Sequence, residues 1–275
     1  MVKMGDVWDR TVEFLGDQLG ALLPIALAAF LVPSAIMSNL WDLIPGGTLG
    51  FRGAAACAVL VLSIVMFWGQ LAVTALAIDS APGHAATRTA TRRLPAALLV
   101  AVIVAVVSLL LILPFPAILV ASGMHFAGSA VQAADLAAVP VGARLAASLY
   151  LLAALVFGLW LYARMMLVTP IVVGEGHALG AFGRSFARTR GMALKIIGVL
   201  FLYVITSWVA ESAGTFVFGA IFRLVAGSGD GGVSLASVLT TILVSAIQTG
   251  FTVLGTAFVA KLYLALSVSP AIADT

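Results

Sequence analysis

Long apolar runs separated by short polar segments dominate the chain. A helix needs about 20 apolar residues to cross the hydrocarbon core of a bilayer, and six runs are long enough. They lie at Leu19–Leu40, Gly53–Ile78, Pro95–Ser122, Ala143–Val173, Met192–Phe222 and Val233–Ser269. The pattern predicts an all-α fold, a polytopic membrane bundle of six transmembrane helices that forms one domain over residues 1–275.

A different pattern precedes the first run. Apolar residues recur there every three or four positions among mostly polar ones, which is typical of an amphipathic helix in the membrane interface. These residues are Met4, Trp8, Val12, Leu15 and Leu19. Four acidic residues between Asp6 and Asp17 stand where a signal peptide would be basic or apolar, so we expect no cleaved signal peptide.

Composition narrows the class of protein. The chain is 63% hydrophobic and only 9% charged, whereas soluble domains carry about 25% charged residues. This excludes a soluble globular domain, a disordered chain and a protein that binds nucleic acid. The single cysteine, Cys57, lies inside an apolar run and excludes a disulfide framework.

The positions of Lys and Arg predict the orientation. With both termini in the cytoplasm, eleven of the fourteen basic residues fall on the cytoplasmic side and only Arg52, Arg144 and Arg223 fall outside. Cytoplasmic loops are normally enriched in Lys and Arg. We therefore expect a multi-pass protein of a bacterial inner membrane with both termini inside.

Two stretches about 95 residues apart resemble each other. Val73-Thr74 recurs as Val168-Thr169, and Arg88-Thr89 recurs as Arg184-Ser185. Together with a weaker N-terminal copy, they suggest a threefold internal repeat with units at 4–79, 84–173 and 177–269. Each unit would be one cytoplasmic interfacial amphipathic helix followed by a helical hairpin, which predicts about three such helices. The alternative is that any six-span protein with cytoplasmic arginines shows such coincidences.

Five arginines are candidates for binding lipid headgroups. Arg88 and Arg92 share one helix face, and Arg184 and Arg188 share another, with Arg190 close by. In one interpretation they are anchors on anionic headgroups, worth about 1 kcal/mol each. In the other, the two pairs converge on a single phosphate, which arginine contacts well.

Two acids, Asp79 and Glu175, end the second and fourth spans. A carboxylate there is stabilised by the positive N-terminal end of the following helix, and it can pair with the arginines beyond it. We interpret both as structural, with proton coupling as the alternative.

Three polar residues lie within spans. Glu211 is the ionisable one, and such a residue suggests function because burying its charge is costly. In one interpretation it reaches the outer interface, where it is solvated or paired with Arg144 or Arg223. In the other, it lines a cavity. Gln70 and Gln248 are the other two, and interhelical hydrogen bonds of about 0.6 kcal/mol each explain them without a substrate.

No catalytic residue, metal site or cofactor is expected. His84 and His177 belong to cytoplasmic connections and His125 to the outer side, so the three cannot share a metal. The chain contains no nucleotide-binding loop, no GxSxG sequence and no HExxH sequence.

One motif carries a family resemblance. The stretch from Pro170 to Gly191 reads PIVVGEGHALGAFGRSFARTRG. It resembles the membrane domain of some glycerophosphoryl diester phosphodiesterases and of related six-span bacterial inner-membrane proteins. The matching residues are Pro170, Glu175, Gly176, Arg184, Ser185, Phe186, Thr189, Arg190 and Gly191. The resemblance implies a fold and a location but no reaction, because catalysis in those enzymes belongs to a separate domain.

Three functions follow as hypotheses. The leading one is a non-catalytic module of the inner membrane that is structural, accessory or phospholipid-interacting. Its expected partners are membrane phospholipids and, for the accessory role, another membrane protein. The second is a transporter or lipid-translocating protein with a path lined by Gln70, Glu211 and Gln248. The third, an enzyme, would need a catalytic partner chain.

Overall fold

The computed structural model of the chain describes residues 3–44, 46–79, 83–123, 139–176, 178–226 and 235–268. Within these ranges the chain forms helices and short turns, without a β strand. Six helical stretches of the described chain are long and apolar enough to cross a membrane, which confirms the six predicted runs. They are Leu19–Leu40, Leu49–Asp79, Gly83–Ala121, Val141–Glu175, Ala193–Phe222 and Leu235–Ser267.

The first span follows the amphipathic helix α1 (Met4–Asp17) and is built of three pieces. These are α2 (Leu19–Ala26), the π-helical segment η1 (Leu27–Leu31) and α3 (Val32–Leu43). Pro33 lies in the first turn of α3 and has no N–H, so the carbonyl of Ala29 lacks its α-helical donor. The π-helical turns of η1 lie directly before this proline, where the regular α-helical hydrogen bond is missing.

The remaining spans are also segmented. The second is the single helix α4 (Leu49–Asp79) and the third is α5 (Gly83–Ile112) with α6 (Pro114–Ala121). The fourth is α8 (Val141–Met165) with α9 (Val168–Glu175), followed by the short helix α10 (Gly180–Arg188). The fifth comprises α11 (Ala193–Ala213), the π-helical η2 (Gly214–Phe218) and α12 (Gly219–Ala226), and the sixth is α13 (Leu235–Val268).

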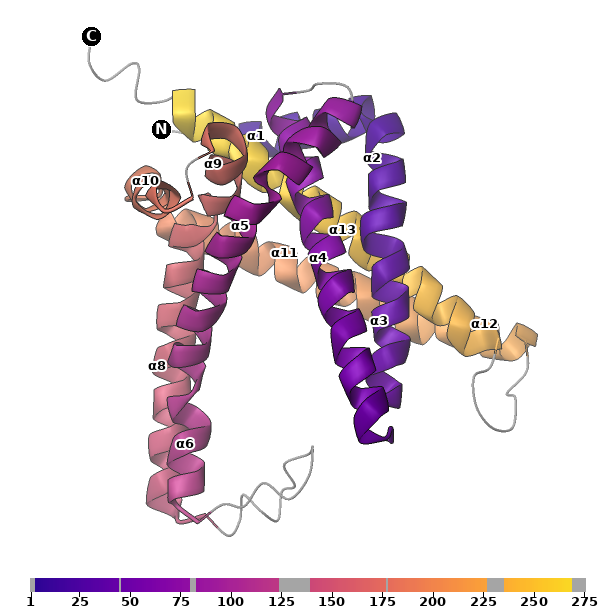
Figure 1. Ribbon diagram of the computed structural model, residues 1–275, viewed down its shortest axis with the longest axis vertical. Helices are drawn as coiled ribbons and strands as arrows, with labels where there is room; N and C mark the ends of the chain where they lie inside the picture. Colours follow the sequence, from indigo (N-terminus) through magenta and orange to yellow (C-terminus); the bar gives the residue numbers. More distant parts are fainter. Residues whose placement is uncertain are drawn as a thin grey trace.

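The helices form two diverging arms (Figure 1). One arm consists of α5, α6 and α8, and the other contains α2, α3 and α4, while α11 and α13 run obliquely to both. The arms meet at the end of the molecule where α1, α9 and α10 lie. This end also contains the main core, because Leu71 and Leu76 of α4, Ile171 of α9 and Leu262 of α13 are fully buried there in one cluster.

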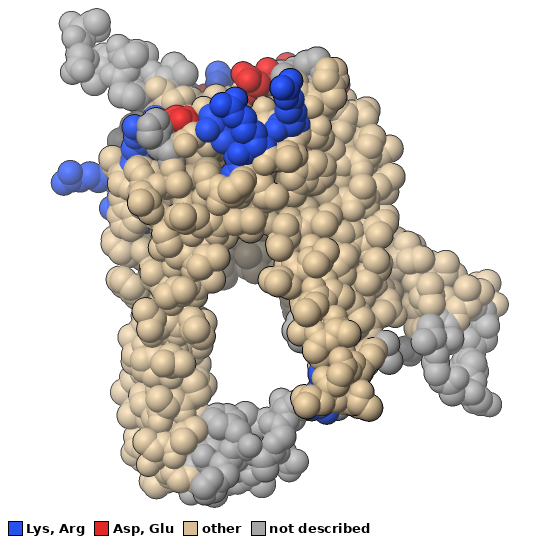
Figure 2. Space-filling view, viewed as in Figure 1, with Lys and Arg blue, Asp and Glu red and all other residues tan. Residues whose placement is uncertain are grey.

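Charged side chains gather at the same end (Figure 2). Lys, Arg, Asp and Glu cover the surface above α5 and α10, whereas the visible sides of both arms are almost free of charge. Arg52 and Arg144 lie near the beginnings of α4 and α8, at the far ends of those helices from Asp79 and Arg164. This segregation fits a bilayer, since charge inside hydrocarbon is costly.

The interfacial position of the predicted amphipathic helices stays a prediction. The helices α1 and α10 are separate and short, but residues 84–93 are the first turns of the continuous helix α5, with Pro95 inside it. Figure 1 shows these first turns lying across the end of the bundle before α5 turns along α8. The threefold repeat stays a prediction, and His125 and His177 lie outside the described residues.

A close contact joins α4 to the first span. A Cβ built on Gly69 would lie 2.5 Å from the Cβ of Ala29 and 3.1 Å from the ring of Phe30. Both partners are fully buried and belong to η1. Glycine at this position therefore lets two backbones approach, as small residues commonly do between membrane helices.

We predict that Gly69→Ala lowers the stability of the purified protein, by about 1–3 kcal/mol, because the added methyl overpacks this contact. Gly53→Ala is the matched control on the same helix, since nothing lies within 4 Å of the place its added methyl would occupy. Thermal unfolding in lipid nanodiscs measures both. Equal unfolding temperatures for the two variants would show that the contact is looser than described.

Candidate functional site

Glu175 is the centre of a cluster at the charged end. Its carboxylate forms ion pairs with Arg184 and with Arg188, and the Arg188 Nη2 lies 2.9 Å from Oε1. The hydroxyl of Tyr263 donates a hydrogen bond of 3.1 Å to the same Oε1. The Arg188 guanidinium also lies 5.1 Å from the centre of the Tyr263 ring. The Glu175 cluster (Glu175, Arg184, Arg188 and Tyr263) thus joins α9, α10 and α13.

A second set of contacts fixes α10 to α8. Ser185 is fully buried, and its hydroxyl donates to the carbonyl of Arg164 at 2.5 Å. In return, Arg164 Nη1 donates to the carbonyl of Phe186 at 2.9 Å. The Arg164 guanidinium lies 5.5 Å from the Trp160 ring and 5.9 Å from the Phe186 ring. Arg164 therefore links α8 to α10 through both its backbone and its side chain.

Two glycines of the motif adopt the left-handed conformation. Gly176 ends α9 with φ +78°, and Gly191 has φ +80° after α10. Such positions favour glycine because it has no Cβ. A Cβ on Gly176 would also overlap the guanidinium of Arg93, which comes from α5. The spacing E-G…R-S-F-x-x-T-R-G is therefore the pattern of a turn held by ion pairs and two left-handed glycines.

The other candidate arginines differ from Arg184 and Arg188. Arg88, Arg92 and Arg190 are exposed, and no ion pair is recorded for them among the described residues. Arg188 keeps one buried Nη1 donor without a hydrogen-bond partner in the same part of the chain. The clamp in which both pairs converge on one phosphate stays a prediction.

Asp79 and Glu175 occupy similar places but make different contacts. Asp79 is exposed at the end of α4, whereas the side chain of Glu175 is 20% exposed within its cluster. The last turn of α4 is instead held by Lys261, whose Nζ donates to the carbonyl of Ala77 at 2.9 Å. The same ammonium lies 4.6 Å from the Phe14 ring of α1, so α13 joins both helices.

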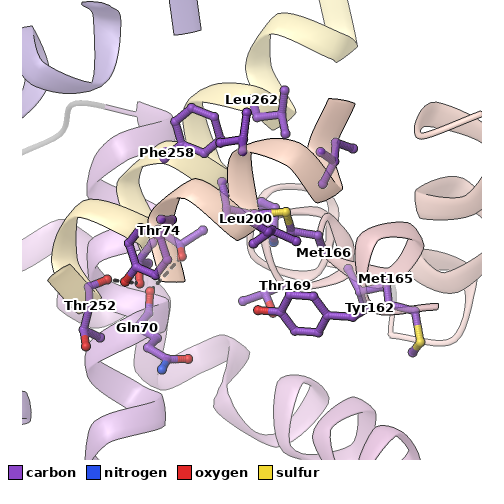
Figure 3. A pocket seen from close by; sticks show the side chains of 18 of the residues that line it. Gln70, Thr74, Tyr162, Met165, Met166, Thr169, Leu200, Thr252, Phe258 and Leu262 are labelled. Carbon is purple, nitrogen blue, oxygen red and sulfur yellow. Dashed lines mark hydrogen bonds between the residues drawn. The ribbon is translucent and has the colours of Figure 1, made fainter. Parts of the chain in front are cut away.

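An apolar cavity of ≈1050 Å³ lies beneath this charged end. Its walls come from α1, α4, α5, α8, α9, α11 and α13, and Figure 3 shows Met165, Met166, Leu200, Phe258 and Leu262 on them. A few polar side chains, Gln70, Tyr162, Thr169 and Thr252 among them, also line it (Figure 3). A mostly apolar pocket with few polar groups is typical of a ligand site.

The three intramembrane candidates are divided between two places. Gln70 lines the large cavity. Gln248 instead donates from Nε2 to Oε2 of Glu211 at 3.2 Å, in a separate small pocket. Arg144 was one expected partner of Glu211, but among the described residues the side chain that binds Glu211 is Gln248. The side chain of Arg223, the other expected partner, lies outside the described residues. The predicted single path through Gln70, Glu211 and Gln248 is therefore split.

In the part of the chain that the structure describes, no three His, Cys, Asp or Glu residues are grouped closely enough to hold a metal ion. No protein-family model, no curated protein and no solved structure matches this chain. The assignment of function therefore depends on the geometry of the cavity and its charged end.

Sequence reasoning placed Arg93, Arg164 and Lys261 on the cytoplasmic side but did not predict their contacts, and it did not single out Tyr263. Tyr263 and Lys261 bind groups 88 and 184 residues away along the chain. No local spacing reports such contacts. The one available signal was Lys261 itself, a lone cation within an apolar run.

We predict that Arg188→Ala destabilises α10 more than Arg184→Ala does. The Arg188 side chain is 26% exposed against 47% for Arg184, and loss of a partly buried charged hydrogen bond costs about 2 kcal/mol. An exposed pair is worth about 1 kcal/mol or less. Amide hydrogen exchange over Gly180–Arg188 measures the effect, with exposed Arg190→Ala as control. Faster exchange in Arg190→Ala than in Arg188→Ala would contradict the role given to the Glu175 cluster.

Proposed function

We propose that this chain is a non-catalytic protein of the bacterial inner membrane that binds phospholipid. An acyl chain would occupy the apolar cavity, and the phosphate would lie among the arginines above it. The observation that carries the proposal is the position of a ≈1050 Å³ apolar cavity directly beneath the charged end.

The walls of the cavity favour a lipid chain over a water-soluble ligand. Leu200, Phe258 and Leu262 present only hydrocarbon to it. Burial of such surface is favourable by about 25 cal/mol per Å² when the occupant is apolar. In a bilayer, the apolar molecules available to fill such a space are lipids. The hydroxyls of Tyr162 and Thr169 provide donors for the ester groups near the headgroup.

The charge at this end favours an anionic headgroup. Arg88, Arg92 and Arg190 are exposed cations, each worth about 1 kcal/mol near an anionic surface. Arg188 adds the buried Nη1 donor that has no partner among the described residues. Arginine forms forked contacts to phosphate. Glu175 neutralises much of Arg184 and Arg188, so a bound phosphate would share these two residues with it.

The orientation and the accessory role belong to the same proposal. The gathering of basic residues at one end supports placing that end, with α1 and the end of α13, in the cytoplasm. The resemblance to the membrane domain of glycerophosphoryl diester phosphodiesterases supports a module that works beside another protein.

We predict that Ala101→Trp removes bound phospholipid, because Ala101 of α5 lines the cavity and the indole would project into the space of the acyl chain. Val106→Trp is the control on the same helix, since Val106 is exposed and does not line the cavity. Both variants are extracted in native-bilayer particles, exchanged into mild detergent and analysed for retained lipid by native mass spectrometry. The wild type and Val106→Trp should retain phospholipid.

Equal lipid retention in both variants would overturn the cavity as the lipid site. A stoichiometric protein in place of lipid would identify that protein as the occupant and reject the lipid assignment.

Translocation of lipid is the second candidate function. The observation that favours it is that Tyr203, Phe251 and Thr252 line both the large cavity and the small pocket of Glu211. If the protein only binds lipid, proteoliposomes containing it should move fluorescent phospholipid between leaflets no faster than empty vesicles. Accelerated movement that Ala101→Trp abolishes would establish translocation instead.

A further inference from the structure

A small pocket of ≈200 Å³ lies between the first, second, fifth and sixth spans, apart from the charged end. Oxygen-bearing side chains dominate its polar lining. Five of them are hydroxyls, on Ser34, Tyr203, Ser207, Thr249 and Thr252, and the others are the Glu211 carboxylate and the Gln248 amide. All of these residues belong to membrane-length helices.

Every hydroxyl of this pocket already donates its hydrogen to a backbone carbonyl. Ser34 donates to Leu31 at 3.0 Å, Ser207 to Val204 at 3.1 Å and Thr249 to Ser245 at 2.7 Å. Tyr203 donates to Phe251 at 2.7 Å and Thr252 to Gln248 at 2.8 Å. A hydroxyl has one hydrogen and two lone pairs. Each of the five can therefore only accept from, or coordinate, a further partner.

The carboxylate of Glu211 adds the negative charge. Its recorded partner is the neutral amide of Gln248, and no ion pair involving Glu211 is recorded among the described residues. Apart from that amide, the polar lining therefore offers acceptors and no donors. A pocket of this kind within a membrane attracts a positively charged occupant, because an unpaired charge in hydrocarbon is costly.

The backbone beside the pocket is irregular in two places. Phe30 of the π-helical η1 lines the pocket, and η2 begins three residues after Glu211. Single π turns inside α-helices occur frequently at functional sites. They also leave carbonyl groups outside the regular hydrogen-bond ladder, and such carbonyls coordinate cations in membrane transporters.

We propose that Glu211, Gln248 and these hydroxyls form a binding site for a monovalent metal cation, of the class of sodium or potassium. One carboxylate balances one positive charge, whereas a divalent ion would leave a net charge inside the membrane. The oxygen donors match the preference of hard cations. The proposal does not rest on phospholipid binding, although Tyr203 and Thr252 line both this pocket and the large cavity.

Binding of radioactive sodium to the full-length protein in nanodiscs, in a choline buffer, tests the proposal. A parallel series uses rubidium as the tracer for potassium. The wild type should bind one of the two ions saturably, with displacement by the unlabelled ion and not by choline. Glu211→Gln should abolish binding, and Thr249→Val should weaken it by about tenfold.

Two control variants distinguish loss of the cation site from a general loss of folding. Thr240→Val removes a hydroxyl on the same helix that makes the same bond, to Ala236 at 2.7 Å, but does not line the pocket. Asp79→Asn removes an acid elsewhere, and both variants should bind like the wild type. Thermal unfolding in choline buffer identifies folded variants, and Thr249→Val replaces Glu211→Gln if the latter does not fold. Absence of saturable binding of either ion, or binding unchanged by Glu211→Gln and Thr249→Val, would overturn the proposal.

Discussion

The carboxylate of Glu175 is the interaction on which the charged end of the molecule depends. It binds Arg184 and Arg188 of α10 and accepts a hydrogen bond from Tyr263 of α13. The next residue, Gly176, lies against the guanidinium of Arg93 from α5. Residues of α5, α9, α10 and α13 therefore meet at this turn. Because a partly buried carboxylate needs such partners, Glu175 fixes α10 and α13 against the end of α9.

The cavity lies next to this joined end, since Val172 and Leu262 on its walls are close in sequence to Glu175 and Tyr263. The helices are held together by the Glu175 cluster and by Lys261, which binds the last turn of α4 and contacts α1. Below these contacts the two arms diverge (Figure 1). The cavity lies among α1, α4, α5, α8, α9, α11 and α13, and its walls are mainly apolar. The charged end corresponds to the headgroup of a phospholipid, and the apolar cavity beneath it corresponds to an acyl chain. This correspondence is the physical basis of the proposed function.

Hydrophobic run length predicted the spans well because each one is a local property of the chain. Leu19–Leu40 was predicted with the bounds found, and Met192–Phe222 differs by one residue at its start. The predicted start at Pro95 was wrong by twelve residues, since α5 continues through this proline to Gly83. Glu175 was predicted to pair with arginines beyond it. Tyr263 and Arg93 could not be foreseen, because their contacts depend on tertiary packing without a local signal.

The central claim is that a phospholipid chain fills the cavity beneath the Glu175 cluster. An electron cryomicroscopy structure of the protein in nanodiscs of bacterial lipid tests it most directly. The account predicts continuous density for an acyl chain beside Leu200 and Phe258, leading to headgroup density near Arg188. A cavity closed by its own side chains, or filled by a helix of another protein, would contradict it.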